Sequence, residues 1–130
     1  MAVSEIDKRR IAEDILMKNG ISPGLAGFNC LVLAMLKHGE GPFDELKISS
    51  LYHELAKELG ATYGAVERRI RHAVETIKIR KIDSPMYDFI DRRDYRITNS
   101  EFLGYVFLMY RRAIEDVKSD KSHKYKGKTL

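Results

Sequence analysis

The residues most capable of chemistry lie between positions 67 and 81, where basic side chains alternate with apolar ones. The segment AVERRIRHAVE places Arg71 and His72 three and four residues after Arg68. An arginine side chain carries a planar fork of donors that matches the O6 and N7 acceptors of guanine. Glu67 can accept a hydrogen bond from a cytosine amino group, and His72 can contact a base or a phosphate. These residue types predict recognition of base edges in double-stranded DNA.

Helical periodicity separates these polar side chains from an apolar stripe. At 3.6 residues per turn, the apolar residues of the segment fall within one arc: Val66, Ile70, Ala73, Val74 and Ile77. Arg68, Arg71 and His72 lie almost opposite, with Glu67 and Arg69 on the two flanks. The sequence therefore predicts a helix over about 62–80 with one buried and one cationic face.

A shorter amphipathic helix precedes this one and is joined to it by a tight turn. Its apolar stripe is formed by four residues: Leu51, Leu55, Ala56 and Leu59. Gly60 can adopt the left-handed conformation that the turn requires, and Thr62 is a suitable N-cap for the second helix. Two helices joined in this way predict a helix-turn-helix, whose second helix enters the major groove.

A recognition helix points its N-terminal half at the bases. We therefore expect base contacts from four residues: Glu67, Arg68, Arg71 and His72. The helix N-terminus and the remaining cations are suited to the DNA backbone. The residues expected to contact phosphate are Thr62, Tyr63, Arg69, Lys78, Arg80 and Lys81.

A second interpretation of this helix needs no DNA. A cationic face is often solvated surface, stabilised by pairs such as Glu67–Arg71 and Arg71–Glu75. Periodicity alone leaves both interpretations open. The apolar run Phe102–Tyr110 indicates core, and its aromatic content also allows a subunit interface. The alternative function is therefore a helical protein–protein interaction module that uses this last helix.

Helices are expected over most of the remaining chain. Residues 4–18 form a charged helix with Ser4 as its cap and Asn19-Gly20 as its stop signal. Ser22-Pro23 opens a second helix, apolar nearly all round, that reaches about Lys37. The later elements are a weak helix over 44–50, a helical turn over 86–90, and a last helix from Thr98 or Asn99 to about 117.

These elements predict an all-α fold, a compact bundle of about six helices that contains the helix-turn-helix. The expected boundaries are 1–19 for an N-terminal charged helix, 20–117 for the DNA-binding domain and 118–130 for a basic, disordered tail. The tail carries Lys118, Lys121, Lys124, Lys126 and Lys128 against the single acid Asp120.

Composition agrees with one small domain that has no catalytic machinery. The chain has 130 residues, of which 44% are hydrophobic, and a formal net charge of +4. Its single cysteine, Cys30, excludes an internal disulfide and is expected to be a buried small hydrophobe. No signal peptide, membrane span, phosphate loop, nucleophile elbow or metal-ligand spacing is recognisable, so we expect a cytoplasmic, non-enzymatic protein without a cofactor or metal.

The segment AVERRIRHAVE, within residues 48–76, resembles the DNA-binding effector domain of the stage zero sporulation protein A family. The block TNSEF at 98–102 is similar to the start of that family's last helix, and Gly20-Ile21 before an apolar helix fits its first helices. The resemblance covers about residues 20–116. It implies a winged-helix-like, sporulation-regulator effector fold and binding to short promoter elements, often by two domains in tandem, which allows a homodimer on DNA.

Carried over by position, the family's base-contacting helix falls on Glu67, Arg68, Arg71 and His72. The chain departs from the family pattern in two places. Ala65 replaces a polar residue expected before VER, which puts a neighbouring contact in doubt. About twenty residues occupy the place of a phosphoacceptor receiver domain, so control by phosphorylation is in doubt, and we expect a stand-alone regulator or an excised domain.

Overall fold

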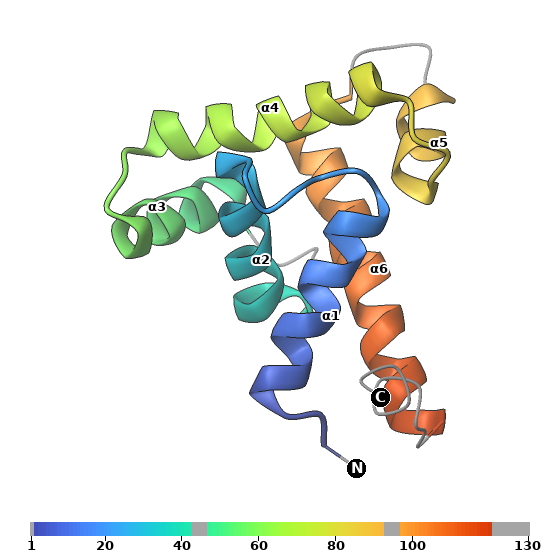
Figure 1. The fold of residues 1–130 in the computed structure, drawn as a ribbon. Coiled ribbons are helices and arrows are strands. Elements are labelled where there is room, and N and C mark those ends of the chain that lie inside the picture. The colour runs from blue at the N-terminus through green and yellow to red at the C-terminus, as the bar shows by residue number, and fades with distance from the viewer. Residues whose placement is uncertain (1, 43–46, 93–96, 121–130) are drawn as a thin grey trace.

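The computed structural model describes residues 2–42, 47–92 and 97–120, and within these ranges the backbone forms helices and no strand (Figure 1). In chain order the helices are α1 (Glu5–Lys18), α2 (Ala26–His38), α3 (Ile48–Leu59), α4 (Tyr63–Arg80), α5 (Pro85–Asp91) and α6 (Asn99–Asp120). The predicted all-α bundle of about six helices is confirmed.

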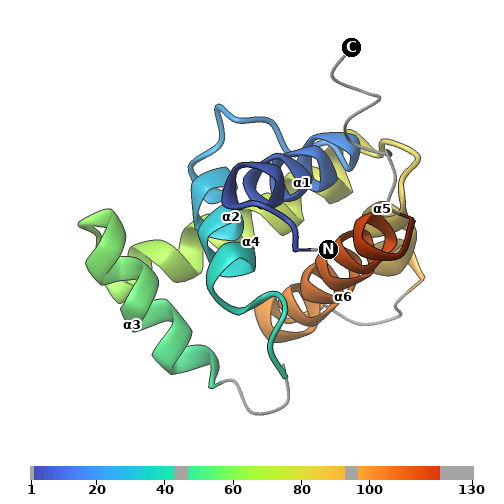
Figure 2. The ribbon, with the colours of Figure 1, turned by 90° about the horizontal axis from the view of Figure 1, so that it is seen from below.

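Helix α2 lies at the centre of the bundle, in contact with α1, α3, α4 and α6 (Figure 2). Because neighbours surround it, apolar side chains can be buried on nearly every side of the helix. Its buried side chains include Phe28, Leu31, Val32 and Met35. Cys30 is also fully buried, as expected for a small hydrophobe.

Helix α6 packs against α1, α2 and α4 along its apolar face. The aromatic and aliphatic residues of this face are all buried within the chain: Phe102, Leu103, Val106, Phe107, Tyr110 and Ile114. The run Phe102–Tyr110 is therefore mainly core. Its largest side chains already have partners inside the domain.

Polar side chains cap α1, α5 and α6; the sequence predicts the caps of α1 and α6 but not the one at Ser84. The Ser4 hydroxyl accepts a hydrogen bond from the Asp7 backbone N–H at 3.1 Å, and Ser84 caps α5 in the same way. At α6, Thr98 is the cap, because its hydroxyl accepts from the Glu101 N–H at 3.0 Å while the Glu101 carboxylate accepts from the Thr98 N–H at 2.9 Å. This reciprocal pair is a capping box.

The predicted start of the second helix is wrong. Helix α2 begins at Ala26 and not at Pro23, since Ser22–Leu25 form a turn closed by a 3.0 Å hydrogen bond from the Leu25 N–H to the Ser22 carbonyl. The turn follows Gly20, whose φ of 90° is left-handed, and Ile21, which is completely buried. Burial of Ile21 delays the helix, because the chain must leave the core before it turns into α2.

Two other boundaries also differ from the prediction. Ile48–Ser50 are the first turn of α3 and not part of a separate helix; residues 44–46 of that predicted element lie outside the described residues. Helix α6 continues to Asp120, beyond the predicted end near 117. An ion pair of 3.8 Å from Lys118 Nζ to Glu40 joins this last turn to the α2–α3 connection. The rest of the predicted tail, 121–130, lies outside the described residues.

Candidate nucleic-acid interface

The turn between α3 and α4 has the conformation that its sequence predicts. Gly60 is left-handed, with φ 63° and ψ 37°, and the Ala61 N–H donates to the Ala56 carbonyl at 2.9 Å. The Thr62 hydroxyl then accepts from the Ala65 N–H at 3.0 Å and caps α4. This short connection sets the angle between the two helices and forms the helix-turn-helix.

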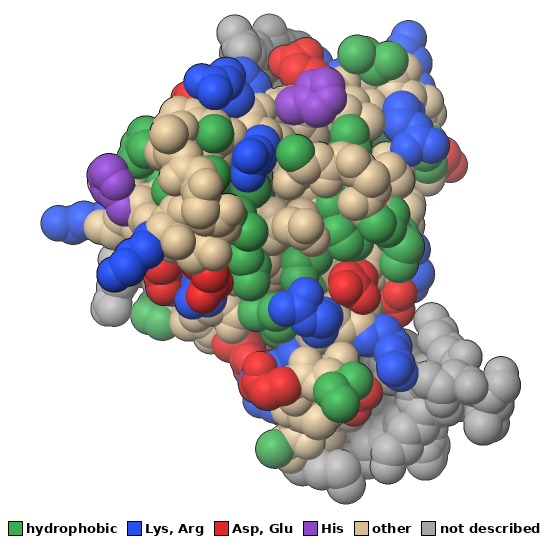
Figure 3. All heavy atoms as spheres, turned by 60° about the vertical axis from the view of Figure 1, so that its left-hand side comes forward, with side chains coloured by type: hydrophobic (Ala, Val, Ile, Leu, Met, Phe, Trp, Pro, Cys, Tyr) green, Lys and Arg blue, Asp and Glu red, His purple; other side chains and the backbone are tan. Residues whose placement is uncertain are grey.

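The apolar arc of α4 is buried in full, which fixes the rotation of the helix about its axis. Its members are Val66, Ile70, Ala73, Val74 and Ile77. Arg68 and His72, on the opposite side, are exposed, and Arg71 is half-buried. Basic and histidine side chains accordingly occur along the upper part of the face formed by α3 and α4, with carboxylates between them (Figure 3). The structure thus brings Arg68, Arg71 and His72 to one accessible surface.

Arg71 is held by an ion pair within its own helix. Its Nη2 atom donates to the Glu67 carboxylate at 2.9 Å, and the two side chains are 37% and 39% exposed. The i,i+4 pair expected under the alternative interpretation is therefore present. A pair this exposed adds little stability. It can still orient the guanidinium, whose remaining donors are available at the surface.

The start of α6 is attached to the same turn of α4. The Asn99 side-chain amide, 7% exposed, donates to the Glu67 carbonyl at 3.1 Å. The sequence suggests Asn99 only as a possible cap. Its contact with α4 spans 32 residues of chain, so no local pattern could reveal it.

Helices α2 and α4 approach each other closely at Gly27. A Cβ atom at this position would lie 2.5 Å from the carbonyl oxygen of Arg69, so only glycine allows the observed contact. Arg69 consequently lies where the two helices are in contact, and its charge acts on the buried Cys30 thiol. Burial raises the pKa of Cys30, and the nearby Arg69 charge opposes this effect. Arg69 is thus positioned by α2 as well as by its own helix.

An aromatic cluster lies at the N-terminal end of α4. The Tyr63 ring packs edge-on against Tyr52 at a centroid distance of 5.3 Å, and it lies tilted against the His53 ring at 4.7 Å. Tyr52 is buried, and burial raises the pKa of its hydroxyl. His53 is exposed beside the predicted phosphate contact Tyr63, although the sequence pattern does not mark it as a contact. Its proximity depends on the α3–α4 angle, which periodicity does not define.

The remaining predicted phosphate contacts are at the other end of α4. Arg80 is twelve positions after Arg68, or about 18 Å along the helix axis at 1.5 Å per residue. Its Nη1 atom donates to the Gly20 carbonyl at 2.7 Å and so joins α4 to the α1–α2 turn. Lys78 and Lys81 are exposed. The basic side chains therefore form two groups, one at positions 68–72 near the middle of the helix and one at positions 78–81 at its C-terminal end.

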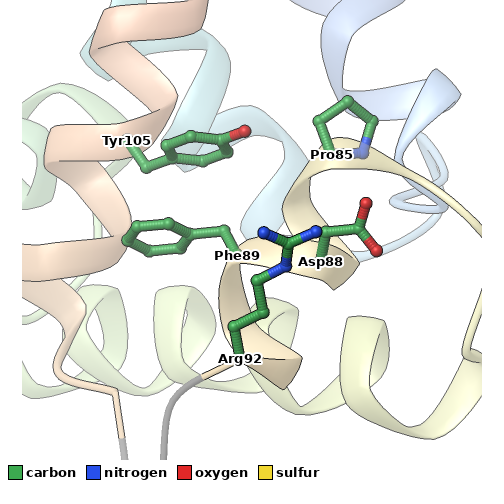
Figure 4. A pocket seen from close by; sticks show the side chains of 5 residues that line it. All are labelled: Pro85, Asp88, Phe89, Arg92 and Tyr105. Atoms are coloured by element: carbon green, nitrogen blue, oxygen red, sulfur yellow. The ribbon is translucent and has the colours of Figure 1, made fainter.

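A separate hollow of about 410 Å³ lies between α5 and α6. Phe89 and Tyr105 stack on each other at one side of it, with a centroid distance of 4.2 Å and nearly parallel rings, while Pro85, Asp88 and Arg92 line the α5 side (Figure 4). These residues do not include any of the predicted DNA contacts. The stack attaches α5 to the bundle.

The comparison with protein families supports DNA binding by the chain as a whole. The model described as the sporulation initiation factor Spo0A C terminal matches residues 12–121, which include α2 to α6. The chain belongs to this family. The Spo0A C-terminal domain is the DNA-binding effector domain of a sporulation regulator, and the family is not a catalytic one.

Membership of the Spo0A C-terminal family thus supports double-stranded DNA as the partner of this chain and transcription regulation as its role. Neither a curated protein nor a solved structure matches the chain. Among the described residues, none of the helices has the length and apolar character needed to span a bilayer.

Proposed function

We propose that this chain is a sequence-specific reader of double-stranded DNA, with α4 in the major groove, where Arg68, Arg71, His72 and Glu67 contact base edges. The observation that carries the proposal is the rotation of α4. Its apolar arc is completely enclosed, so its cationic residues face outward at helical spacing. A helix about 10–12 Å wide fits the major groove, and arginine on such a face can reach guanine.

The proposed backbone contacts fall into two groups along this helix. Thr62, Tyr63 and Arg69 lie in its first half, and Lys78, Arg80 and Lys81 lie at its end. A helix that crosses the major groove meets the phosphates of both strands near its ends. We further propose that the protein acts in the cytoplasm and that two chains bind adjacent sites in tandem.

The alternative of a protein–protein interaction module on α6 has less support. Its basis was the apolar character of the last helix, and the apolar face of α6 is buried against α1, α2 and α4. No comparable apolar surface of α6 remains for a partner among the side chains described.

Selection of bound sequences from a random duplex pool, followed by fluorescence anisotropy at two salt concentrations, tests the proposal. We expect one preferred site, bound with a Kd on the order of 10⁻⁸ M near physiological salt, and a marked loss of affinity at higher salt. Equal and weak binding to all duplexes would contradict sequence-specific recognition. The stoichiometry on single and tandem sites, measured by sedimentation, tests the arrangement in pairs.

A further inference from the structure

A groove of about 280 Å³ runs between α4 and the N-terminal end of α2. Its lining consists of small side chains and cationic or titratable ones: Ala26, Gly27, Ala65, Arg68, Arg69 and His72. The small residues leave space between the helices, and the others place positive charge around it. Neither helix has an acidic residue in its first turn.

The groove lies at the edge of the proposed base-reading face and shares two residues with it. Arg68 and His72 belong both to that face and to the groove, whereas the Arg69 side chain lines the groove from the flank of α4, and the Arg69 backbone packs against Gly27 of α2. A recognition helix nearly fills the major groove, which is about 12 Å wide. Groups on the flank of such a helix therefore meet the sugar–phosphate backbone of the adjoining strand.

The start of α2 adds to the same positive region. Leu25 occupies the N-cap position, and no side chain caps this end of the helix. The first N–H groups of α2 and the positive end of its dipole therefore accompany the three side chains of α4. These groups together match the charge and hydrogen-bonding capacity of a phosphodiester.

We propose that this groove binds one phosphate of the DNA backbone, so that α2 is a second DNA-contacting helix and Arg69 is its main charged ligand. The inference rests on the proposed function. The bound phosphate fixes the register of α4 along the major groove, because it lies on α2 and α4 at once. The contact carries no base preference of its own.

Ala26→Glu is the most direct test of the groove. Ala26 is exposed at the first position of α2, where a glutamate suits the helix dipole and should not disturb folding. The introduced carboxylate would repel the phosphate. We expect affinity for the selected duplex and for random duplexes to fall by about tenfold. Ile6→Glu is the matched control, since it makes the same change of charge at an exposed position of α1; its affinity should change much less.

Duplexes with a single neutral methylphosphonate locate the phosphate. In the unmodified protein we expect one position per bound chain at which neutralisation weakens binding by about tenfold, and in Ala26→Glu that position should lose its effect. Arg69→Gln should lose the same sensitivity. The proposal would be overturned if Ala26→Glu and Ile6→Glu had the same affinity for DNA. It would also be overturned if both groove variants kept the methylphosphonate sensitivity of the unmodified protein.

A free anion, rather than the DNA backbone, is the other ligand that this groove could hold. Saturable shifts of the Ala26 and Gly27 amide resonances with inorganic phosphate, without any methylphosphonate-sensitive position on DNA, would assign the groove to a free anion and overturn the DNA-backbone assignment. If the unmodified protein selected no duplex sequence at all, the proposed function would fail. If instead the unmodified protein selected a sequence but the groove variants bound it normally, only the groove proposal would fail.

Discussion

The Arg71 side chain is held in one orientation by an ion pair and is still accessible to a ligand. Its guanidinium is bound to Glu67 at 2.9 Å, yet more than a third of the side chain remains exposed. Burial of Ile70 and Val74 on the other side of α4 keeps it at the surface. A guanidinium held by a carboxylate loses less freedom when it binds a base, because its orientation is already restricted. The ion pair is thus compatible with base reading.

Replacement of this side chain is the first prediction. Arg71→Ala should leave the helical fold intact, cost roughly 1–3 kcal/mol in binding to the selected site and relax one base preference. Anisotropy on the selected duplex and its single-base variants measures both effects, with circular dichroism as the check of folding. Arg112→Ala, which removes the same charge from an exposed position of α6, is the control. An unfolded Arg71→Ala protein would identify Arg71 as structural.

Tyr110 gives a stability prediction at the same scale. Its hydroxyl is buried with no hydrogen-bond partner among the described residues, and burial raises the pKa of the group. Because an unsatisfied buried hydroxyl costs free energy, Tyr110→Phe should keep or raise the free energy of unfolding, by up to about 1 kcal/mol. Urea denaturation measures the change. A decrease of more than about 1 kcal/mol would show that the hydroxyl has a partner.

At the scale of elements, each helix of the helix-turn-helix is attached to the core by a polar contact. Asn99 of α6 binds the backbone of α4, and the C-terminal end of α2 binds α3. In the second attachment, His38 Nε2 lies 2.7 Å from a Glu54 carboxylate oxygen and Lys37 Nζ lies 3.5 Å from the other. Lys37 also pairs with Glu58 at 3.2 Å. These contacts resist rotation of α3, and with it of α4, relative to α2.

The third prediction concerns the pH dependence of this attachment. The hydrogen bond with His38 lowers the pKa of Glu54 from its ordinary value of 4.5, with a smaller contribution from Lys37. The ionised carboxylate therefore stabilises the fold above pH 4.5, and this contribution disappears as the pH falls through the lower folded-state pKa. The side chain is 41% exposed, so the effect should not exceed about 0.5 kcal/mol.

Unfolding experiments at about pH 5.5 and about pH 3 on the original protein and on Glu54→Gln measure this contribution. The free-energy difference between the two proteins should shrink at the lower pH, because protonation removes the charge that the variant already lacks. Glu115→Gln, which removes an exposed carboxylate of α6, is the control. A Glu54→Gln difference that stayed constant would mean that the carboxylate charge contributes nothing to the attachment.

At the scale of the whole molecule, charge is spread unevenly. The 23 Lys and Arg residues nearly balance 19 Asp and Glu residues, so attraction to DNA must come from where the cations lie. One group of cations lies along α4. Another is in residues 121–130, where the sequence contains Lys121, Lys124, Lys126 and Lys128 but no Asp or Glu.

Deletion of residues 121–130 is the fourth prediction. It should weaken binding to all duplexes alike and lower the salt dependence, by about 0.9 in the slope of log K against log salt for each phosphate that the shortened protein no longer neutralises. The ratio of specific to random binding should stay the same, because the segment lacks the arginines suited to guanine. Binding titrations at several salt concentrations measure both quantities. An unchanged slope would show that these lysines do not touch DNA.

Most of the helix-turn-helix could be predicted because it depends on local rules. The arc from Val66 to Ile77, the turn at Gly60 and the cap at Thr62 each follow from residues within one or two turns of one another. The start of α2 could not be predicted in this way. Pro23 is suited to the first position of a helix, but burial of Ile21 draws the chain through the core first and moves the start to Ala26.

The sequence by itself determined which side chains of α4 turn inward and which turn outward, since a period of 3.6 residues assigns faces without reference to the rest of the chain. The tertiary structure alone decided what lies beside those faces: Arg69 against α2, His53 beside Tyr63, and Asn99 on the carbonyl of Glu67. Such neighbours depend on the angles at which helices cross. Those angles result from close contacts such as the one at Gly27, and residues distant in sequence make them together.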